Sequence, residues 1–232
     1  MTAGPGAARD SPCADKLHLL SNVCYLVSPR KLTLDKDRVL AAGLQFVRRE
    51  GLPALSARAL ADELGASVAP IYRAYASMEG LTEAVLNAAM EQLDEYIARP
   101  YTDFPFRSAG VGLVMFARDE PRLFRALFVD QEHAGELVAR MRACLRQIVD
   151  QSPKLRRLSA AVRDELIMDL WIYTHGLASM VIANLLPRPE PDLVDRKLER
   201  VGAIVIGAAM AATLDLVPML SATPKRKGRK KT

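Results

Sequence analysis

Residues 56–75, SARALADELGASVAPIYRAY, decide the fold, because they predict two short helices joined by a tight turn. The hydroxyl of Ser56 is placed to accept a hydrogen bond from a free N–H in the first turn of the first helix. Gly65 ends that helix, since it adopts a backbone conformation that a β-carbon resists. Ser67 is placed to cap the second helix, with Pro70 in the first turn, where a missing N–H costs little. The pattern is a helix-turn-helix, whose second helix is the one that enters a DNA major groove.

The apolar residues of the two predicted helices are spaced so that the helices pack against each other. In the second helix, Ile71 and Tyr75 are four residues apart and share one face. The apolar stripe of the first helix consists of Leu60, Ala61 and Leu64. Four residues remain on the outer face of the second helix: Val68, Ala69, Tyr72 and Arg73.

Helix-period runs flank this pair on both sides. Residues 35–49 predict an amphipathic helix, and residues 78–99 predict a longer one. A family pattern is carried by Ala41, Ala42, Gly51, Leu55, Ser56, Leu60, Ala61, Leu64, Gly65, Ser67, Ile71, Tyr72, Tyr75, Ser77, Glu79 and Leu81. Through these residues the segment 34–86 resembles the N-terminal domain of the TetR family of transcriptional regulators, without a gap between Ser56 and Leu81.

A DNA-binding domain of this kind needs donors for phosphates, side chains at the base edges and a symmetric partner. Phosphate contacts are expected from the N-terminal amides of the helices that begin near residues 57 and 78, together with Lys31, Lys36, Ser56 and Tyr72. For Tyr72 the resemblance implies that the hydroxyl touches the DNA backbone. Base contacts are expected from Arg58, Ser67, Val68, Ala69 and Arg73. Either arginine can contact guanine through two hydrogen bonds, and the competing interpretation is a solvated surface charge.

The segment Ser77-Met78-Glu79-Gly80-Leu81 departs from the family pattern, which usually has a lysine at its second position. Met78 removes one phosphate contact, and Gly80 weakens the start of the helix. The affinity for DNA is therefore expected to be lower than is typical of the family.

Positive charge lies at the two ends of a chain whose net charge is +5. Residues 225–231, KRKGRKK, hold six positive charges, and residues 30–80 hold eight basic and six acidic side chains. Residues 81–224 hold 16 basic and 19 acidic side chains, so the middle is mildly acidic. The basic tail is expected either to add contacts with phosphates that are independent of sequence or to act only as a solubilising segment.

The remainder of the chain predicts helices rather than strands, so the fold class is all-α. Further helices are expected near residues 107–118, 121–128, 131–151, 159–186 and 192–216. The sequence therefore predicts that the chain is divided into four segments: a flexible arm (1–30), a TetR-type helix-turn-helix domain (31–80), a helical effector-binding and dimerisation domain (81–220) and a basic disordered tail (221–232).

The resemblance implies an apolar effector pocket among the fourth to eighth helices. Its expected lining is Phe104, Met115, Phe116, Phe124, Phe128, Met141, Met168, Trp171 and His175. Most such side chains are ordinary core in a helix bundle. His175 is either a polar anchor for the effector or a histidine with a structural role.

Residues 201–214, VGAIVIGAAMAATL, hold no charge and are too short to cross a membrane. A helix without a polar face must be covered on every side, and a second copy of the chain is the expected cover. The expected dimer interface is Met180, Ala183, Gly202, Ala203, Ile206, Gly207 and Met210. Such a dimer would set two recognition helices about 34 Å apart.

Catalysis is not expected, because the sequence has no nucleophile, phosphate-binding or dinucleotide motif and no metal-ligand spacing. Neither a cofactor nor a metal is expected. The three cysteines, Cys13, Cys24 and Cys144, are scattered, which favours a reducing cytoplasm over a disulfide framework. The leading hypothesis is a homodimeric repressor that binds a palindromic operator and is released by a small apolar effector. The alternative is a TetR-like adaptor or co-activator that acts through a protein partner without a small ligand.

Overall fold

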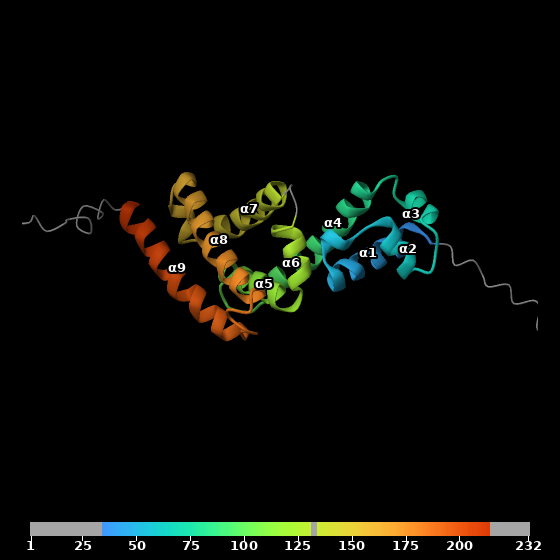
Figure 1. Ribbon diagram of the computed structural model, residues 1–232. Helices are drawn as coiled ribbons and strands as arrows, with labels where there is room; N and C mark the ends of the chain where they lie inside the picture. The colour runs from blue at the N-terminus through green and yellow to red at the C-terminus, as the bar shows by residue number, and fades with distance from the viewer. Residues whose placement is uncertain (1–33, 131–133, 214–232) are drawn as a thin grey trace, which may run out of the picture. The chain divides into compact units, whose positions relative to one another are not determined.

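The computed structural model describes residues 34–130 and 134–213, and in these ranges the chain forms helices and no strand, which confirms the all-α prediction. The described residues from Asp35 onward belong to one structural unit (Figure 1). The predicted arm and the predicted tail lie outside the described residues. The α-helices are α1 Lys36–Glu50, α2 Ala57–Glu63, α3 Ala69–Ala74, α4 Met78–Ala98, α5 Pro105–Asp119, α6 Pro121–Phe128, α7 Ala134–Gln151, α8 Ala160–Ile182 and α9 Pro191–Thr213, with 3-10 turns η1 Leu52–Ala54 and η2 Leu155–Arg157.

The helix-turn-helix forms where the sequence predicts it, as α2 and α3. Ser56 caps α2, because its hydroxyl accepts a hydrogen bond of 3.2 Å from the N–H of Ala59. Gly65 ends the helix with φ at +59°, and the N–H of Ala66 donates to the carbonyl of Ala61 over 2.9 Å. This is the hydrogen bond that closes a glycine-terminated helix.

The start of α3 differs from the prediction. Val68, and not Ser67, occupies the capping position, and its side chain makes no capping hydrogen bond. A cap at Ser67 would place Pro70 third in the helix, at a position whose N–H a capping hydroxyl binds. Since proline has no N–H, the serine has no donor there and lies exposed in the turn.

Helices α1 to α4 share an apolar core under the helix-turn-helix. Leu60 of α2 and Ile71 of α3 are buried, and so are Val39 of α1 and Leu81 of α4. Tyr75 is buried as well, and its hydroxyl donates to the carbonyl of Lys36 over 3.4 Å. This core holds α2 and α3 in place and leaves their outer faces exposed.

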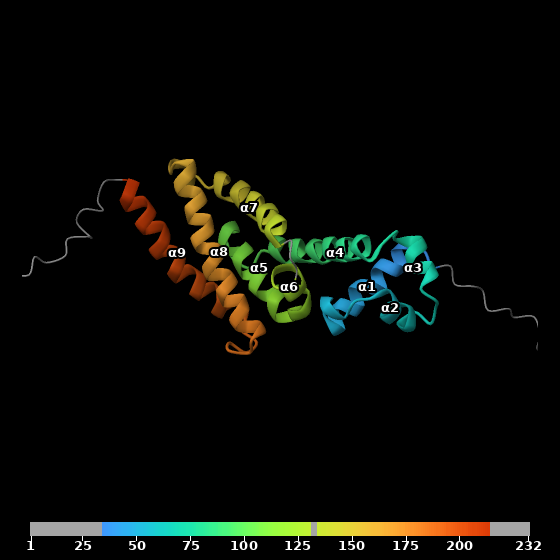
Figure 2. The same cartoon turned by 45° about the horizontal axis from the view of Figure 1, so that its top comes forward.

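Helix α4 contacts α1 through its first part, and it packs along α5 and against α6 (Figure 2). Gly112 of α5 allows this crossing, because a β-carbon at that position would lie 2.9 Å from the Cα of Ile97. Helix α5 is the centre of the larger bundle, and all residues from Val111 to Ala117 are buried. It packs against α4, α8 and α9, so α4 links helices α1–α3 to the centre of the bundle.

Helix α8 ends at Ile182, earlier than the prediction of residue 186. Asn184 takes the left-handed conformation, with φ at +57°, and the N–H of Leu185 donates to the carbonyl of Met180 over 2.9 Å. Asparagine tolerates this conformation better than most residues, so the helix ends without a glycine. Helix α9 then runs beside α8 (Figures 1 and 2). None of the described helices has the length and apolar character that crossing a lipid bilayer requires.

Candidate functional site

The outer face of α3 is exposed and carries the residues that the sequence assigns to base contacts. Ser67, Ala69 and Arg73 are exposed, and Val68 and Tyr72 keep 41% and 48% of their surface accessible. Val68 and Tyr72 therefore do not belong to the buried core of the described residues. The structure therefore brings these five predicted residues together on one surface.

Arg58 is exposed in the first turn of α2, the helix that precedes α3. Among the described residues, neither Arg58 nor Arg73 makes an ion pair. Arg49 of α1 differs, because it donates to both carboxylate oxygens of Glu63, with the shorter bond at 2.8 Å. The two unpaired guanidinium groups keep all their donors available for an anion or a base edge.

The remaining predicted phosphate contacts have different surroundings. The ammonium group of Lys36 lies 5.1 Å from the ring centroid of Tyr75 and is exposed to solvent. The hydroxyl of Ser56 accepts from the backbone and still has its own proton to donate. At the start of α4, the hydroxyl of Ser77 accepts from the N–H of Gly80 over 3.1 Å. Lys31 lies outside the described residues.

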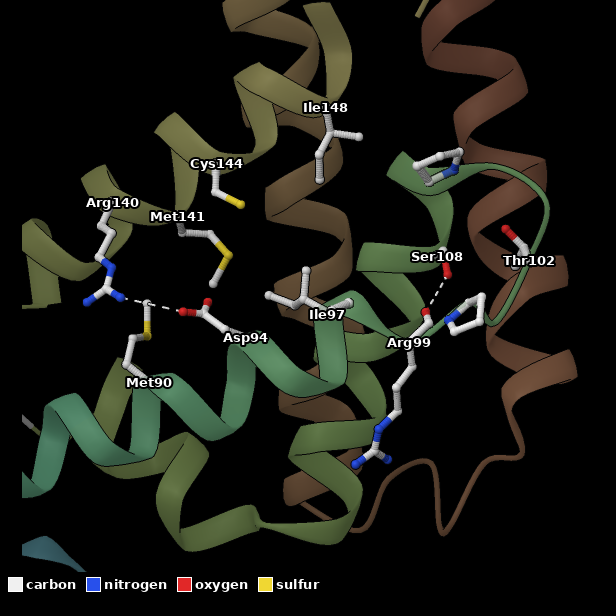
Figure 3. Close-up of a pocket in the computed structure, with 13 residues that line it drawn as sticks. Met90, Asp94, Ile97, Arg99, Thr102, Ser108, Arg140, Met141, Cys144 and Ile148 are labelled. Atoms are coloured by element: carbon white, nitrogen blue, oxygen red, sulfur yellow. Dashed lines mark hydrogen bonds and ion pairs between the residues drawn. The ribbon is translucent and has the colours of Figure 1, made fainter. Parts of the chain in front are cut away.

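A cleft of about 570 Å³ opens between α4, the start of α5 and α7 (Figure 3). Its walls are mostly apolar, with Ile97 on the α4 side and Ile148 on the α7 side. At one end, Arg140 of α7 forms an ion pair of 3.5 Å with Asp94 of α4. Burial raises the pKa of the Asp94 carboxyl, an effect that Arg140 partly opposes.

The far end of the cleft is shaped by a buried hydroxyl. Ser108 of α5 donates to the carbonyl of Arg99 over 2.8 Å and accepts from the N–H of Tyr101 over 2.8 Å. These two hydrogen bonds hold the connection between α4 and α5 in place, and Pro100 and Thr102 of this connection line the cleft. Cys144 lines the α7 wall, and burial raises the pKa of its thiol.

The structure does not gather the nine predicted pocket residues around one cavity. Only Met141 lines the cleft. Met115 and Phe116 are buried in the middle of α5, Met168 is half-buried on α8, and Phe104 is exposed before α5.

The remaining four predicted pocket residues form an aromatic cluster between α6 and α8: Phe124, Phe128, Trp171 and His175. The imidazole of His175 lies 5.3 Å from the ring of Phe124, 5.5 Å from Phe128 and 5.2 Å from Trp171, between ring centroids. No described residue hydrogen-bonds its buried Nδ1 atom. Burial among these rings lowers the pKa of His175, so the imidazole is held in its neutral form.

The seven residues assigned to a dimer interface lie on α8, at its end and on α9, with varied exposure. Met180, Ala183, Ala203 and Gly207 are exposed, whereas Gly202, Ile206 and Met210 are half-buried. The sequence did not point to three larger apolar side chains near these residues: Ile172 on α8, Leu185 just after α8 and Ile204 on α9 are 60%, 70% and 64% exposed. A groove of about 390 Å³ also runs past Ile172 and Met180 to Lys197 of α9.

Comparison with known families identifies both parts of the chain. Residues 39–85 match the family described as bacterial regulatory proteins, tetR family. Residues 106–204 match the tetracyclin repressor-like C-terminal domain, and the two matches together span more than half of the chain.

The chain belongs to the TetR family. It is thus a DNA-binding transcriptional regulator, and regulators of this family are transcription factors and not enzymes. The matched N-terminal segment contains α2 and α3, so the exposed face of α3 lies within the part of the chain that matches the family's DNA-binding domain. The cleft was not expected from the sequence, because its residues Asp94, Arg140 and Cys144 belong to no recognisable sequence motif.

Solved structures show the same fold for this TetR-family chain. A TetR-like transcriptional regulator from Rhodococcus sp. RHA1 is 17% identical, with a TM-score of 0.55 over 76% of this chain and 95% of that one. A tetR-family transcriptional regulator from Streptomyces coelicolor is 16% identical, with a TM-score of 0.54 over 81% and 97%. At these identities the likeness concerns the fold alone. No curated protein matches the chain.

Proposed function

We propose that this TetR-family regulator is a cytoplasmic homodimeric repressor that binds a palindromic operator and is released by a small apolar effector. The observation that carries the proposal is the exposed face of α3, with Tyr72 and Arg73 adjacent in sequence, together with the exposed Arg58 on α2. Tyr72 and Lys36 bind phosphates, and the two arginines read base edges in the major groove.

The second copy covers the outer surface of α8 and α9. Ile172, Leu185 and Ile204 each leave more than half of their apolar side chain exposed on or beside these two helices, and a second copy would cover them. Gly202 and Gly207 support close approach of another helix, because a β-carbon at either position would meet nothing within 4 Å. Four helices, two from each copy, form the interface, and its twofold symmetry matches a palindromic operator.

The effector site of this proposal is the cleft between α4, α5 and α7. Its walls are apolar, and a ligand in it touches Asp94 and Ile97 on the same helix that begins at the DNA-binding domain. A ligand that binds more tightly to one position of α4 shifts the protein toward that position and so changes the affinity for DNA. The aromatic cluster around His175 joins α6 to α8, with Phe124 buried and the other three residues half-buried, and it has a structural role in this proposal.

The test is selection of DNA from a random-sequence pool by the full-length protein, followed by footprinting of the selected sequence. We expect an inverted repeat, and we expect Tyr72→Ala and Arg73→Ala each to weaken binding by about 1–3 kcal/mol. Arg49→Ala is the matched control, because that arginine is paired with Glu63 within the DNA-binding domain. Binding that is sequence-independent, salt-sensitive and unchanged in both variants would contradict the proposal and favour an adaptor.

A further inference from the structure

Arg48, near the end of α1, reaches out of the DNA-binding domain and holds two partners in the bundle. Its Nε atom donates to Glu120 over 2.8 Å, and its Nη2 atom donates to the amide oxygen of Gln92 over 2.7 Å. The side chains of Arg48 and Glu120 are only 30% and 19% exposed. A partly buried guanidinium with two well-aligned partners is held in one orientation, unlike most surface ion pairs.

The two partners belong to the parts of the bundle that meet the DNA-binding domain. Glu120 is the residue between α5 and α6, and it flanks both helices. Gln92 lies on α4, two residues before Asp94 in the cleft. Of the ion pairs among the described residues, Arg48–Glu120 is the one that joins α1–α3 to α5–α9. Arg48 thus ties α1 both to the α5–α6 junction and to the cleft-lining part of α4.

We infer that Arg48 is a positioning residue for operator binding: it fixes the angle of the DNA-binding domain on the bundle, and thereby the separation of half-sites that the dimer accepts. The inference rests on the proposed binding of a palindrome by a dimer. Apolar contacts also join α1 to α4 and α6, but such contacts are not directional. Two hydrogen bonds from a planar guanidinium are directional, so they set the angle.

The spacing of half-sites is the property that this angle controls. Each base pair added between half-sites moves one of them by about 3.4 Å and turns it by about 35° around the DNA axis. Two rigidly held domains cannot follow this change. Domains that pivot on α4 follow part of it, so they accept a wider range of spacers.

The experiment uses full-length protein and the inverted repeat that the wild-type protein selects from random DNA, resynthesised with the spacer one or two base pairs shorter or longer. For the wild type, one added base pair is expected to weaken binding about tenfold, because one of the two DNA-binding domains no longer reaches its half-site in the correct orientation. For Arg48→Ala and for Glu120→Ala we expect a loss of about threefold or less from each variant's own optimum. The double variant should match the single ones, because the pair acts as a unit.

Two further variants separate positioning from folding. Arg49→Ala is the matched control, since it removes a neighbouring arginine whose partners, Glu50 and Glu63, lie within the DNA-binding domain. It should keep the wild-type spacer profile. If Arg48→Ala does not fold, Arg48→Lys decides the question, because one ammonium group does not span both partners and should also widen the profile.

The outcomes distinguish this inference from the proposed function. A wild-type profile in folded Arg48→Ala, or in Arg48→Lys where the alanine variant does not fold, overturns the role of Arg48 and leaves operator binding intact. A wider profile in Arg49→Ala of the same size as in Arg48→Ala also overturns it, since the effect would then be general. If the wild type selects no inverted repeat, the proposed function fails and the inference fails with it.

Discussion

His175 lies among aromatic rings with a lowered pKa, and this makes the stability of the fold dependent on pH. The unfolded histidine titrates near 6.5, whereas the folded one resists protonation because charge is unfavourable among the rings. Below about pH 6.5 the unfolded chain therefore binds a proton that the folded chain does not, and stability falls as the pH falls. Above about pH 6.5 the imidazole of His175 is neutral in both states, so it does not change the pH dependence of stability.

The variant His175→Phe tests this prediction, because it keeps a ring in the cluster and removes the titrating group. Thermal unfolding measured at pH 7.5 and pH 5.5 should show a smaller loss of stability for His175→Phe than for the wild type. The other two histidines are present in both proteins, so the difference between them isolates His175. Equal losses would contradict the prediction.

Cys144 is exposed to solvent at the cleft wall, yet burial raises the pKa of its thiol. Because the thiolate is the reactive form, alkylation by N-ethylmaleimide near neutral pH should be slower than for a free thiol. In a Cys13→Ser, Cys24→Ser background, the apolar dye anilinonaphthalene sulfonate should slow it further by occupying the cleft. Gln147→Cys in the same background with Cys144→Ser is the control, since that exposed position on α7 does not line the cleft. Equal slowing at both positions would place the dye elsewhere.

At the scale of helices, the crossing of α4 and α5 depends on the missing side chain of Gly112. A β-carbon there meets the backbone of α4, so Gly112→Ala should destabilise the fold by about 1–3 kcal/mol. Gly80 is the matched control, since its nearest neighbour would be Ser77 Oγ at 3.7 Å. Gly80→Ala should stabilise the start of α4 by about 0.5–1 kcal/mol. Chemical denaturation measures both, and a neutral Gly112→Ala would contradict the close crossing.

Helix boundaries were predictable where one side chain or one glycine sets them locally. Ser56, Gly65 and Ser77 act at the helix ends as their chemistry dictates. The start of α3 was predicted wrongly, because Pro70, the second residue of the helix, has no N–H for the hydroxyl of Ser67 to bind. The end of α8 depends on Asn184, and asparagine is compatible with a continuing helix as well as with the turn it makes here.

At the scale of the whole molecule, the exposed face of α8 and α9 predicts a dimer. Ile204→Glu places a charge at the centre of the proposed interface, and sedimentation velocity should show a shift from dimer to monomer. Val129→Glu is the control, because Val129 is also an exposed apolar residue but follows α6. A wild type that sediments as a monomer, or an Ile204→Glu variant that sediments as the wild type does, would contradict the interface.

The two candidate sites differ in how far the sequence could reveal them. The proposed DNA-binding surface comes from one six-residue helix and its capping residue, so local periodicity was enough to place Val68, Tyr72 and Arg73 on its outside. The cleft is formed by α4, α5 and α7, which come together only through tertiary packing. Apolar residues in a core and around a cleft have the same composition, which is why Phe116 and Phe124 were expected in a pocket and are buried in the core.

The bridge from Arg48 to Gln92 and Glu120 also determines how the protein can be recombined with its relatives. A chimera that takes its first three helices from another regulator carries a foreign residue opposite Glu120 and Gln92. Such a chimera can fold correctly, and its dimer can still hold the two DNA-binding domains at an angle that does not match the half-sites. A chimera built from this protein should therefore keep Arg48, Gln92 and Glu120 together. Exchanging the DNA-binding segment alone separates Arg48 from its two acceptors.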